Sequence, residues 1–147
     1  MSLRERLTEE MKDAMKAKDE VRLSTIRLVR SAVRNKEIDL KREMGDQEII
    51  ETISSLVKQR RESIRLFAEA GRDDLVAKEE RESAVLMAFL PQQLSREEVA
   101  ELVARVIGEC GAQGGKDMGR VMKALMPHVA GRADGKLVSD VVKEKLG

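Results

Sequence analysis

The sequence is poor in aromatic residues. It has no Trp and no Tyr, and its only aromatic side chains are Phe67 and Phe89. Base stacking on aromatic rings, a common way of gripping single-stranded nucleic acid, therefore has almost no residues to use. Any nucleic-acid partner of this chain is expected to be recognised through its backbone and its shape.

Cysteine and histidine are equally scarce, with one of each, Cys110 and His128. A single cysteine cannot form an internal disulfide, and one Cys with one His cannot build a metal site of these ligands. A Gly-x-Ser-x-Gly nucleophile elbow and a Ser-Ser-Lys amidase arrangement are also missing. We therefore predict no metal, no cofactor and no catalytic residue, and we assign Cys110 to the core because it continues an apolar stripe.

Long apolar runs are absent too. No segment is long enough to span a bilayer, and the first residues do not form a signal peptide. From this we predict a cytoplasmic protein with no membrane partner.

The net charge is close to zero, with 28 Lys and Arg against 27 Asp and Glu. Bulk electrostatics therefore does not indicate a nucleic-acid binder. The charge is uneven along the chain, however, because residues 1–94 hold 19 basic and 19 acidic residues, while residues 111–147 hold 7 and 4. A basic surface is expected near the C-terminus.

What the sequence does contain is helical periodicity. Apolar residues recur at steps of three and four, and the alternation typical of strands is absent, so the fold class is predicted to be all-α. We expect helices from about residue 3 to 17, 20 to 42, 46 to 70, 73 to 90, 96 to 109, 118 to 127 and 135 to 146. The first four are predicted to form an N-terminal unit in residues 1–92, and the last three a compact unit in residues 95–147.

The boundary between the two units is predicted at residues 90–94. Pro91 disfavours helical geometry at Leu90, and Ser95 with Glu98 forms a capping-box pattern that starts the next helix. Ser2 with Glu5 shows the same pattern at the start of the chain. The polar stretch 78–82 is predicted to be exposed helix that bridges two packed regions, in preference to an acidic partner site.

The C-terminal thirty residues form the most distinctive stretch. The helix from Met118 has one apolar face, and Arg120 and Lys123 project from the other. Pro127 should end or kink this helix, and Asp134 can cap the last one. Basic side chains gather here, where they could meet phosphates of a folded RNA. They are Lys116, Arg120, Lys123, His128, Arg132 and Lys136.

Two alternatives accompany this basic cluster. The cluster can equally be a solvated basic edge, and a lone histidine such as His128 is more often a surface or capping group. A second basic stripe, Arg27, Arg30 and Arg34, lies on the helix predicted over 20–42. We favour a solvated face for that stripe, with ion pairs to acids of the preceding helix. Those acids are Glu5, Glu9 and Asp13.

The chain resembles the YqeY-like proteins over nearly its whole length. The stretches that carry the resemblance are residues 22–27 (RLSTIR), 58–64 (KQRRESI), 89–94 (FLPQQL), 116–119 (KDMG), 131–138 (GRADGKLV) and 142–146 (VKEKL). The segment from Lys116 to Leu146 is also similar to the tail of GatB, a subunit of the tRNA-dependent amidotransferase. The catalytic body of that subunit has no counterpart here.

The resemblance implies a tRNA-associated protein whose basic cluster contacts tRNA. It also implies carbon-nitrogen ligase activity with glutamine as amido-N-donor, in which this chain would be accessory because it lacks a catalytic constellation. The alternative is an interaction adaptor that docks amidotransferase subunits or a tRNA synthetase. A small independent amidase or ligase is the third hypothesis.

Overall fold

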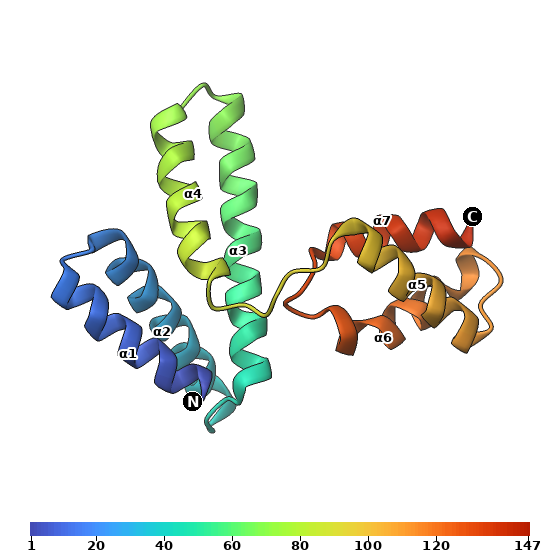
Figure 1. The fold of residues 1–147 in the computed structure, drawn as a ribbon, viewed down its shortest axis with the longest axis horizontal. Helices are drawn as coiled ribbons and strands as arrows, with labels where there is room; N and C mark the ends of the chain where they lie inside the picture. The colour runs from blue at the N-terminus through green and yellow to red at the C-terminus, as the bar shows by residue number, and fades with distance from the viewer. The chain divides into compact units, whose positions relative to one another are not determined.

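The computed structural model describes residues 1–147, and every regular element in it is a helix (Figure 1). The prediction of an all-α fold is confirmed. The elements are α1 (Leu3–Ala17), α2 (Glu20–Leu40), α3 (Asp46–Glu69), α4 (Asp73–Met87), α5 (Arg96–Cys110), the short 3-10 helix η1 (Gly115–Asp117), α6 (Met118–Val129) and α7 (Gly135–Leu146). None of these helices is long and apolar enough to cross a membrane.

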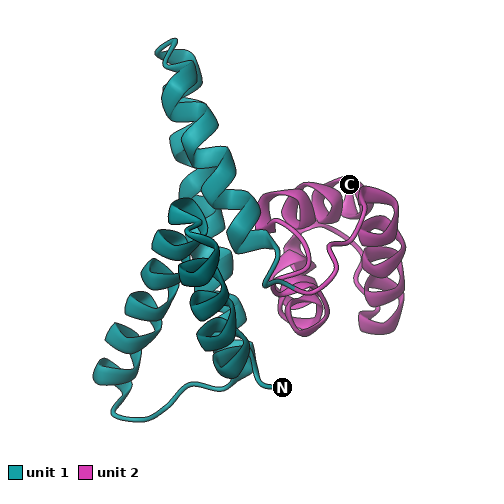
Figure 2. Ribbon diagram, turned by 60° about the vertical axis from the view of Figure 1, so that its left-hand side comes forward, with its two compact units in different colours: residues 1–90 teal, residues 91–147 magenta.

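The chain divides into two compact units, residues 1–90 and residues 91–147 (Figure 2). Each unit has its own hydrophobic core, and no buried residue is shared between the two cores. The first unit contains α1 to α4, and the second contains α5 to α7 together with η1.

Two helical hairpins, α1–α2 and α3–α4, make up the first unit (Figure 1). Lys18 ends α1 in the left-handed region at φ 56°, and the Asp19 carboxylate accepts the backbone N–H of Arg22 at 3.1 Å, which starts α2 immediately. Lys41 ends α2 in the same way at φ 58°, so that helix stops earlier than predicted. At the chain start, Ser2 caps α1 through the Glu5 N–H at 3.1 Å.

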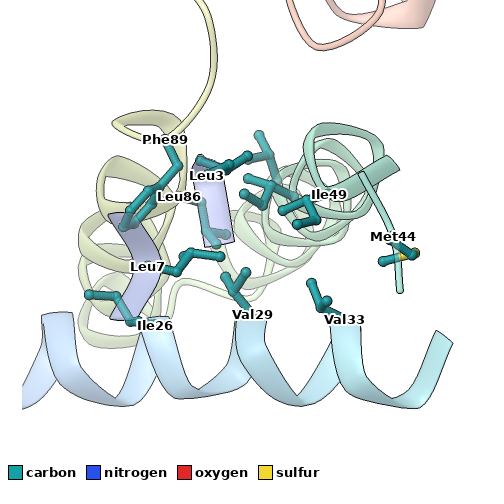
Figure 3. Packing of buried hydrophobic residues seen from close by; sticks show 11 residues of the cluster. Leu3, Leu7, Ile26, Val29, Val33, Met44, Ile49, Leu86 and Phe89 are labelled. Carbon is teal, nitrogen blue, oxygen red and sulfur yellow. The ribbon is translucent and has the colours of Figure 1, made fainter. Parts of the chain in front are cut away.

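The core of the first unit is built mainly from aliphatic side chains on all four helices, with Met44 and Phe89 added from the segments that follow α2 and α4 (Figure 3). Val29 and Val33 project from α2 to the same side, toward the helix that carries Ile49. These residues follow the steps of three and four that predicted the helices. The buried set is Leu3, Leu7, Ile26, Val29, Val33, Met44, Ile49, Ile53, Val57, Leu86 and Phe89.

The prediction that residues 78–82 bridge two packed regions as exposed helix is wrong for Glu79 and Glu82. Their side chains are 18% and 15% exposed, and both carboxylates lie beside the guanidinium of Arg60 on α3. A cation placed between two carboxylates allows this polar part of α4 to pack along α3. The pairing joins residues about twenty positions apart, so helical periodicity alone does not reveal it.

The ion pairs expected for the basic stripe on α2 are also absent. Arg27 and Arg34 have no carboxylate within ion-pair distance, and Arg30 Nη1 donates only to the Met11 sulfur at 2.9 Å. The α1 carboxylate that faces α2 is that of Glu10, and it pairs with Arg22 at 3.0 Å. The expected partners Glu5, Glu9 and Asp13 form no ion pair with the stripe.

The second unit packs three helices around a valine-rich core. Its buried residues are Val99, Val103, Val106, Val121, Leu125, Val129, Val138, Val141 and Val142. The predicted capping box at α5 is confirmed, because Ser95 Oγ accepts the Glu98 N–H and Glu98 Oε1 accepts the Ser95 N–H, both at 3.1 Å. The Asp134 cap of α7 is confirmed as well, since its carboxylate accepts the Lys136 N–H at 3.3 Å.

Helix α6 runs through Pro127 and ends two residues later, at Val129. A proline here removes only the hydrogen bond that its own N–H would have made one turn before the helix end. His128 therefore lies in the last turn of α6, because the helix continues past the end predicted at about residue 127. The chain reverses at Gly131, whose φ of +74° lies in the left-handed region that favours glycine.

Candidate functional site

The predicted basic residues are spread along α6 and the segments that flank it. Lys116 lies in η1, Arg120 and Lys123 lie on α6, and His128 lies in its last turn. Arg132 follows in the loop, and Lys136 lies in the first turn of α7. A 12-residue helix is about 18 Å long, so the structure does not gather the six at one point. They form two groups, one toward each end of α6.

Arg120 is tied to the chain that precedes its helix. Its Nη2 lies 3.2 Å from Oδ1 of Asp117, and the other carboxylate oxygen of Asp117 accepts the Gln113 N–H at 3.0 Å. The Gln113 hydrogen bond and then the charges of Arg120 and Lys116 hold the pKa of Asp117 below its ordinary value. Asp117 therefore stays ionised and offsets part of the Arg120 charge.

Arg132 connects the loop after α6 to the segment before α5. Its Nε donates to the Gln92 carbonyl at 3.4 Å, and its own carbonyl accepts the Leu94 N–H at 2.7 Å. Gln93 adds a hydrogen bond of 2.7 Å from its side-chain amide to the Gly131 carbonyl. These bonds fix the backbone of the loop, so Arg132 has a structural role whatever else it binds.

Arg132 also acts on the cap of α5. The pKa of Glu98 is held low mainly by the backbone N–H of Ser95 and its hydroxyl, with a smaller contribution from the Arg132 charge. The same interactions that form the capping box therefore favour the ionised form of the Glu98 carboxylate.

The remaining cationic side chains are exposed. Lys123, His128 and Lys136 have no side-chain hydrogen bond and no ion pair, and Lys116 influences Asp117 only through its charge. Arg120 and Lys123 are three residues apart and share one face of α6 away from the core, as predicted. Lys123, His128 and Lys136 can therefore meet an anionic partner without breaking an existing contact.

Two further basic residues of the second unit were not among the predicted site residues. Lys143 and Lys145 lie exposed in the last turn of α7, where positive charge is favoured by the helix dipole. Both lysines are among the 7 basic residues of residues 111–147. The excess of positive charge in that segment was therefore the one sequence signal that included them.

The structure contains no group of three or more His, Cys, Asp or Glu residues that could hold a metal ion. Cys110 is half-buried and packs against the core of the second unit. Met118 and Met122 pack against the same core, whereas Met126 is 50% exposed. The chemistry offered by this surface is the binding of anions by exposed cations.

Comparison with known proteins gives the chain a family. A family profile described as "Yqey-like protein" matches residues 4–146. The chain belongs to the YqeY-like protein family. This confirms the relationship inferred from residues 22–27, 58–64, 89–94 and the C-terminal stretch.

Curated relatives of the YqeY-like chain include fungal proteins named "Altered inheritance of mitochondria protein 41, mitochondrial". The protein of Eremothecium gossypii is 44% identical over 85 residues, which are 57% of this chain and 46% of the relative. The protein of Kluyveromyces lactis is 39% identical over 105 residues, which are 69% of this chain and 56% of the relative. The protein of Saccharomyces cerevisiae is 42% identical over 84 residues, which are 56% of this chain and 45% of the relative. The chain thus spans about half the length of these relatives.

These names correct one prediction. We predicted a cytoplasmic protein because a signal peptide is absent, but the relatives are named as mitochondrial proteins. The prediction of a cytoplasmic location is therefore wrong. A secretory-signal pattern, present or not, does not distinguish between the compartments inside a cell.

Proposed function

We propose that this YqeY-like protein is an accessory RNA-binding protein that contacts tRNA through the exposed cations of its second unit. The observation that carries the proposal is the row of unpaired basic side chains along α6 and at the start of α7. They are Lys123, His128 and Lys136, with Lys116 at the other end of the helix.

The physical basis of binding is the attraction between these cations and phosphates. Lysines present point charges to phosphate oxygens, and each such pairing releases counterions from the nucleic acid. The cations are spread along and beside a helix about 18 Å long, so they suit a folded RNA that offers several phosphates over that length. Arg120 and Arg132 act in this proposal as residues that position the surface, since both already bind the protein's own groups.

The link to amidation comes from the resemblance of residues 116–146 to the GatB tail. We propose that the second unit, residues 91–147, acts as a tRNA-contacting domain and that the chain assists glutamine-dependent amidation without catalysing it. The lack of a catalytic constellation supports an accessory role, because amide transfer needs a nucleophile and a partner base that this surface does not supply.

The experiment is a titration of the purified protein with total tRNA over a series of salt concentrations. We expect the logarithm of the binding constant to fall linearly with the logarithm of the salt concentration. The variant Lys123→Ala/Lys136→Ala should reduce that slope by about 0.7 to 0.9 for each phosphate that is no longer neutralised. Lys58→Ala/Lys78→Ala is the matched control, because both lysines are exposed on the first unit. Absence of tRNA binding at low salt, or an equal effect of the control, would contradict the proposal.

One observation favours the alternative function, an adaptor that docks amidotransferase subunits or a synthetase. Met126 exposes half of its side chain on α6, and exposed methionine suits a protein partner. Met126→Glu should then abolish co-elution with purified amidotransferase subunits while leaving tRNA binding intact. If the Met126→Glu variant still co-elutes with the subunits and still binds tRNA, the adaptor hypothesis is wrong.

A further inference from the structure

A pocket of about 580 Å³ opens in the first unit between α1, α2 and α3. Its floor is apolar and consists of Leu7, Val33 and Ile49, which belong to the buried core (Figure 3). The volume lies within the range of small-molecule sites, which typically combine an apolar wall with a few convergent polar groups.

The wall of the pocket is rich in arginine. Arg27, Arg30 and Arg34 line it from α2, and Arg4 lines it from α1. From Arg27 to Arg34 is seven residues, or about 10.5 Å along the helix. The three α2 arginines therefore form a row beside the pocket, and its only carboxylate is that of Glu37.

The carboxylate of Glu37 already has two partners within the protein. Its carboxylate accepts the Met44 N–H at 2.7 Å and is bonded to the Arg4 guanidinium. Four arginines and one glutamate leave the lining with a net charge of +4 − 1 = +3. None of the three α2 arginines that line the pocket has a carboxylate partner, and Thr8 and Ser31 add hydroxyl groups to the same lining.

This lack of partners is unusual within the same unit. Seven other arginines of residues 1–90 lie within ion-pair distance of a carboxylate. A row of three unpaired guanidinium groups beside one concave site is therefore a specific arrangement and differs from the general pattern of paired charges on this surface.

We propose that the pocket binds a small molecule containing two or three linked phosphates. Arginine binds phosphate oxygens through two parallel N–H groups, and a row of such groups matches an extended chain of phosphates better than one phosphate. The concave shape and the apolar floor favour a small ligand over an RNA helix, whose phosphates lie on a convex surface. This site lies on the other unit and does not depend on the proposed tRNA binding.

The test uses the full-length chain and calorimetric titration with inorganic tripolyphosphate, with inorganic phosphate and ATP as comparisons. We expect tripolyphosphate to bind more tightly than phosphate, and Arg30→Ala/Arg34→Ala to weaken that binding about tenfold or more. Both arginines are exposed, so the variant should fold normally. Arg81→Ala/Arg105→Ala removes two exposed arginines outside the pocket and should leave the affinity unchanged.

The comparison with ATP shows whether the ligand is a nucleotide or a free chain of phosphates. Tighter binding of ATP than of tripolyphosphate would identify a nucleotide, and equal binding would identify the phosphate chain itself as the ligand. The proposal is overturned if the wild-type chain does not bind tripolyphosphate, or if the control variant loses as much affinity as the pocket variant. It is also overturned if the pocket variant loses tRNA binding while tripolyphosphate affinity is unchanged, because the row would then serve RNA.

Discussion

The Nε atom of Arg60 on α3 lies 3.2 Å from Oε2 of Glu82 on α4, and Glu79 Oε2 lies 3.6 Å from the same nitrogen. The Arg60 side chain is 17% exposed. Neither contact has hydrogen-bond geometry, since Arg60 Nε and Glu79 Oε2 are buried without a hydrogen-bond partner. Arg60 therefore holds the two carboxylates by the attraction of opposite charges, which offsets the repulsion between them.

Replacement of Arg60 by Met should destabilise the first unit by about 2 kcal/mol, because two partly buried carboxylates are left facing each other. Urea unfolding followed by helical circular dichroism measures the change. The triple variant Arg60→Met/Glu79→Met/Glu82→Met should recover most of the loss, because well-packed apolar groups often replace a buried ion network at no cost. A triple variant less stable than the single one would show that the charges are worth more than their desolvation.

Gly131 should be less tolerant of substitution than a glycine of the second unit whose φ is negative. Its φ is +74°, so Gly131→Ala forces a side chain into the left-handed region and should lower stability by about 1 kcal/mol. Gly135→Ala is the matched control, because Gly135 starts α7 at negative φ and an added Cβ there meets no atom within 4 Å. Thermal unfolding should separate the two variants, with Gly135→Ala unchanged or slightly more stable. Equal melting temperatures would show that the loop accommodates alanine.

Stability should depend on pH through Glu37. The Met44 N–H and then the Arg4 side chain lower the pKa of Glu37, so its ionised form is favoured in the folded protein. The stabilisation is fully present above the ordinary carboxyl pKa and is lost as the pH falls through the lower folded value. Glu37→Gln should therefore be less stable than wild type near neutral pH, and the difference in melting temperature should shrink in acid. A difference that is constant with pH would assign the loss to packing.

Two neighbouring basic residues of α6 should behave differently in RNA binding. Lys123→Ala should weaken tRNA binding and lower the salt slope by the equivalent of about one phosphate, whereas Arg120→Ala should have a smaller effect because Asp117 already offsets its charge. The double variant should keep its helicity, since both side chains are exposed. The assignment of the site would be wrong if the double variant binds tRNA normally while Arg27→Ala/Arg30→Ala abolishes binding.

The sequence was most informative where the signal is local. Ser95 and Glu98 are three residues apart and close a capping box on each other, so their pattern could be interpreted without knowledge of the fold. The apolar stripes of α5 and α6 likewise identified the core, because helical geometry alone decides which residues share a face. These short-range relationships account for the correct all-α assignment.

Contacts between residues far apart in the chain could not be predicted in this way. Arg132 was identified as a basic residue of the site, but its hydrogen bond to the Gln92 carbonyl spans forty positions and depends on how the loop folds back. The basic stripe on α2 was identified, but its lack of carboxylate partners was not predicted. Charge balance over the segment suggested partners, yet the α1 carboxylate nearest to α2, that of Glu10, is taken by Arg6 and Arg22.

The hydrogen bonds from Gln93 and Leu94 to the loop after α6 bear on where this protein can be divided. The carbonyls of Gly131 and Arg132 accept these bonds at 2.7 Å, so the four residues from Pro91 to Leu94 are structurally part of the second unit. A fragment or a gene fusion that begins at Ser95 would leave both carbonyls without these donors and would loosen the loop that holds Arg132. Transplanting this module onto another protein body with its geometry intact therefore requires a junction at or before Pro91.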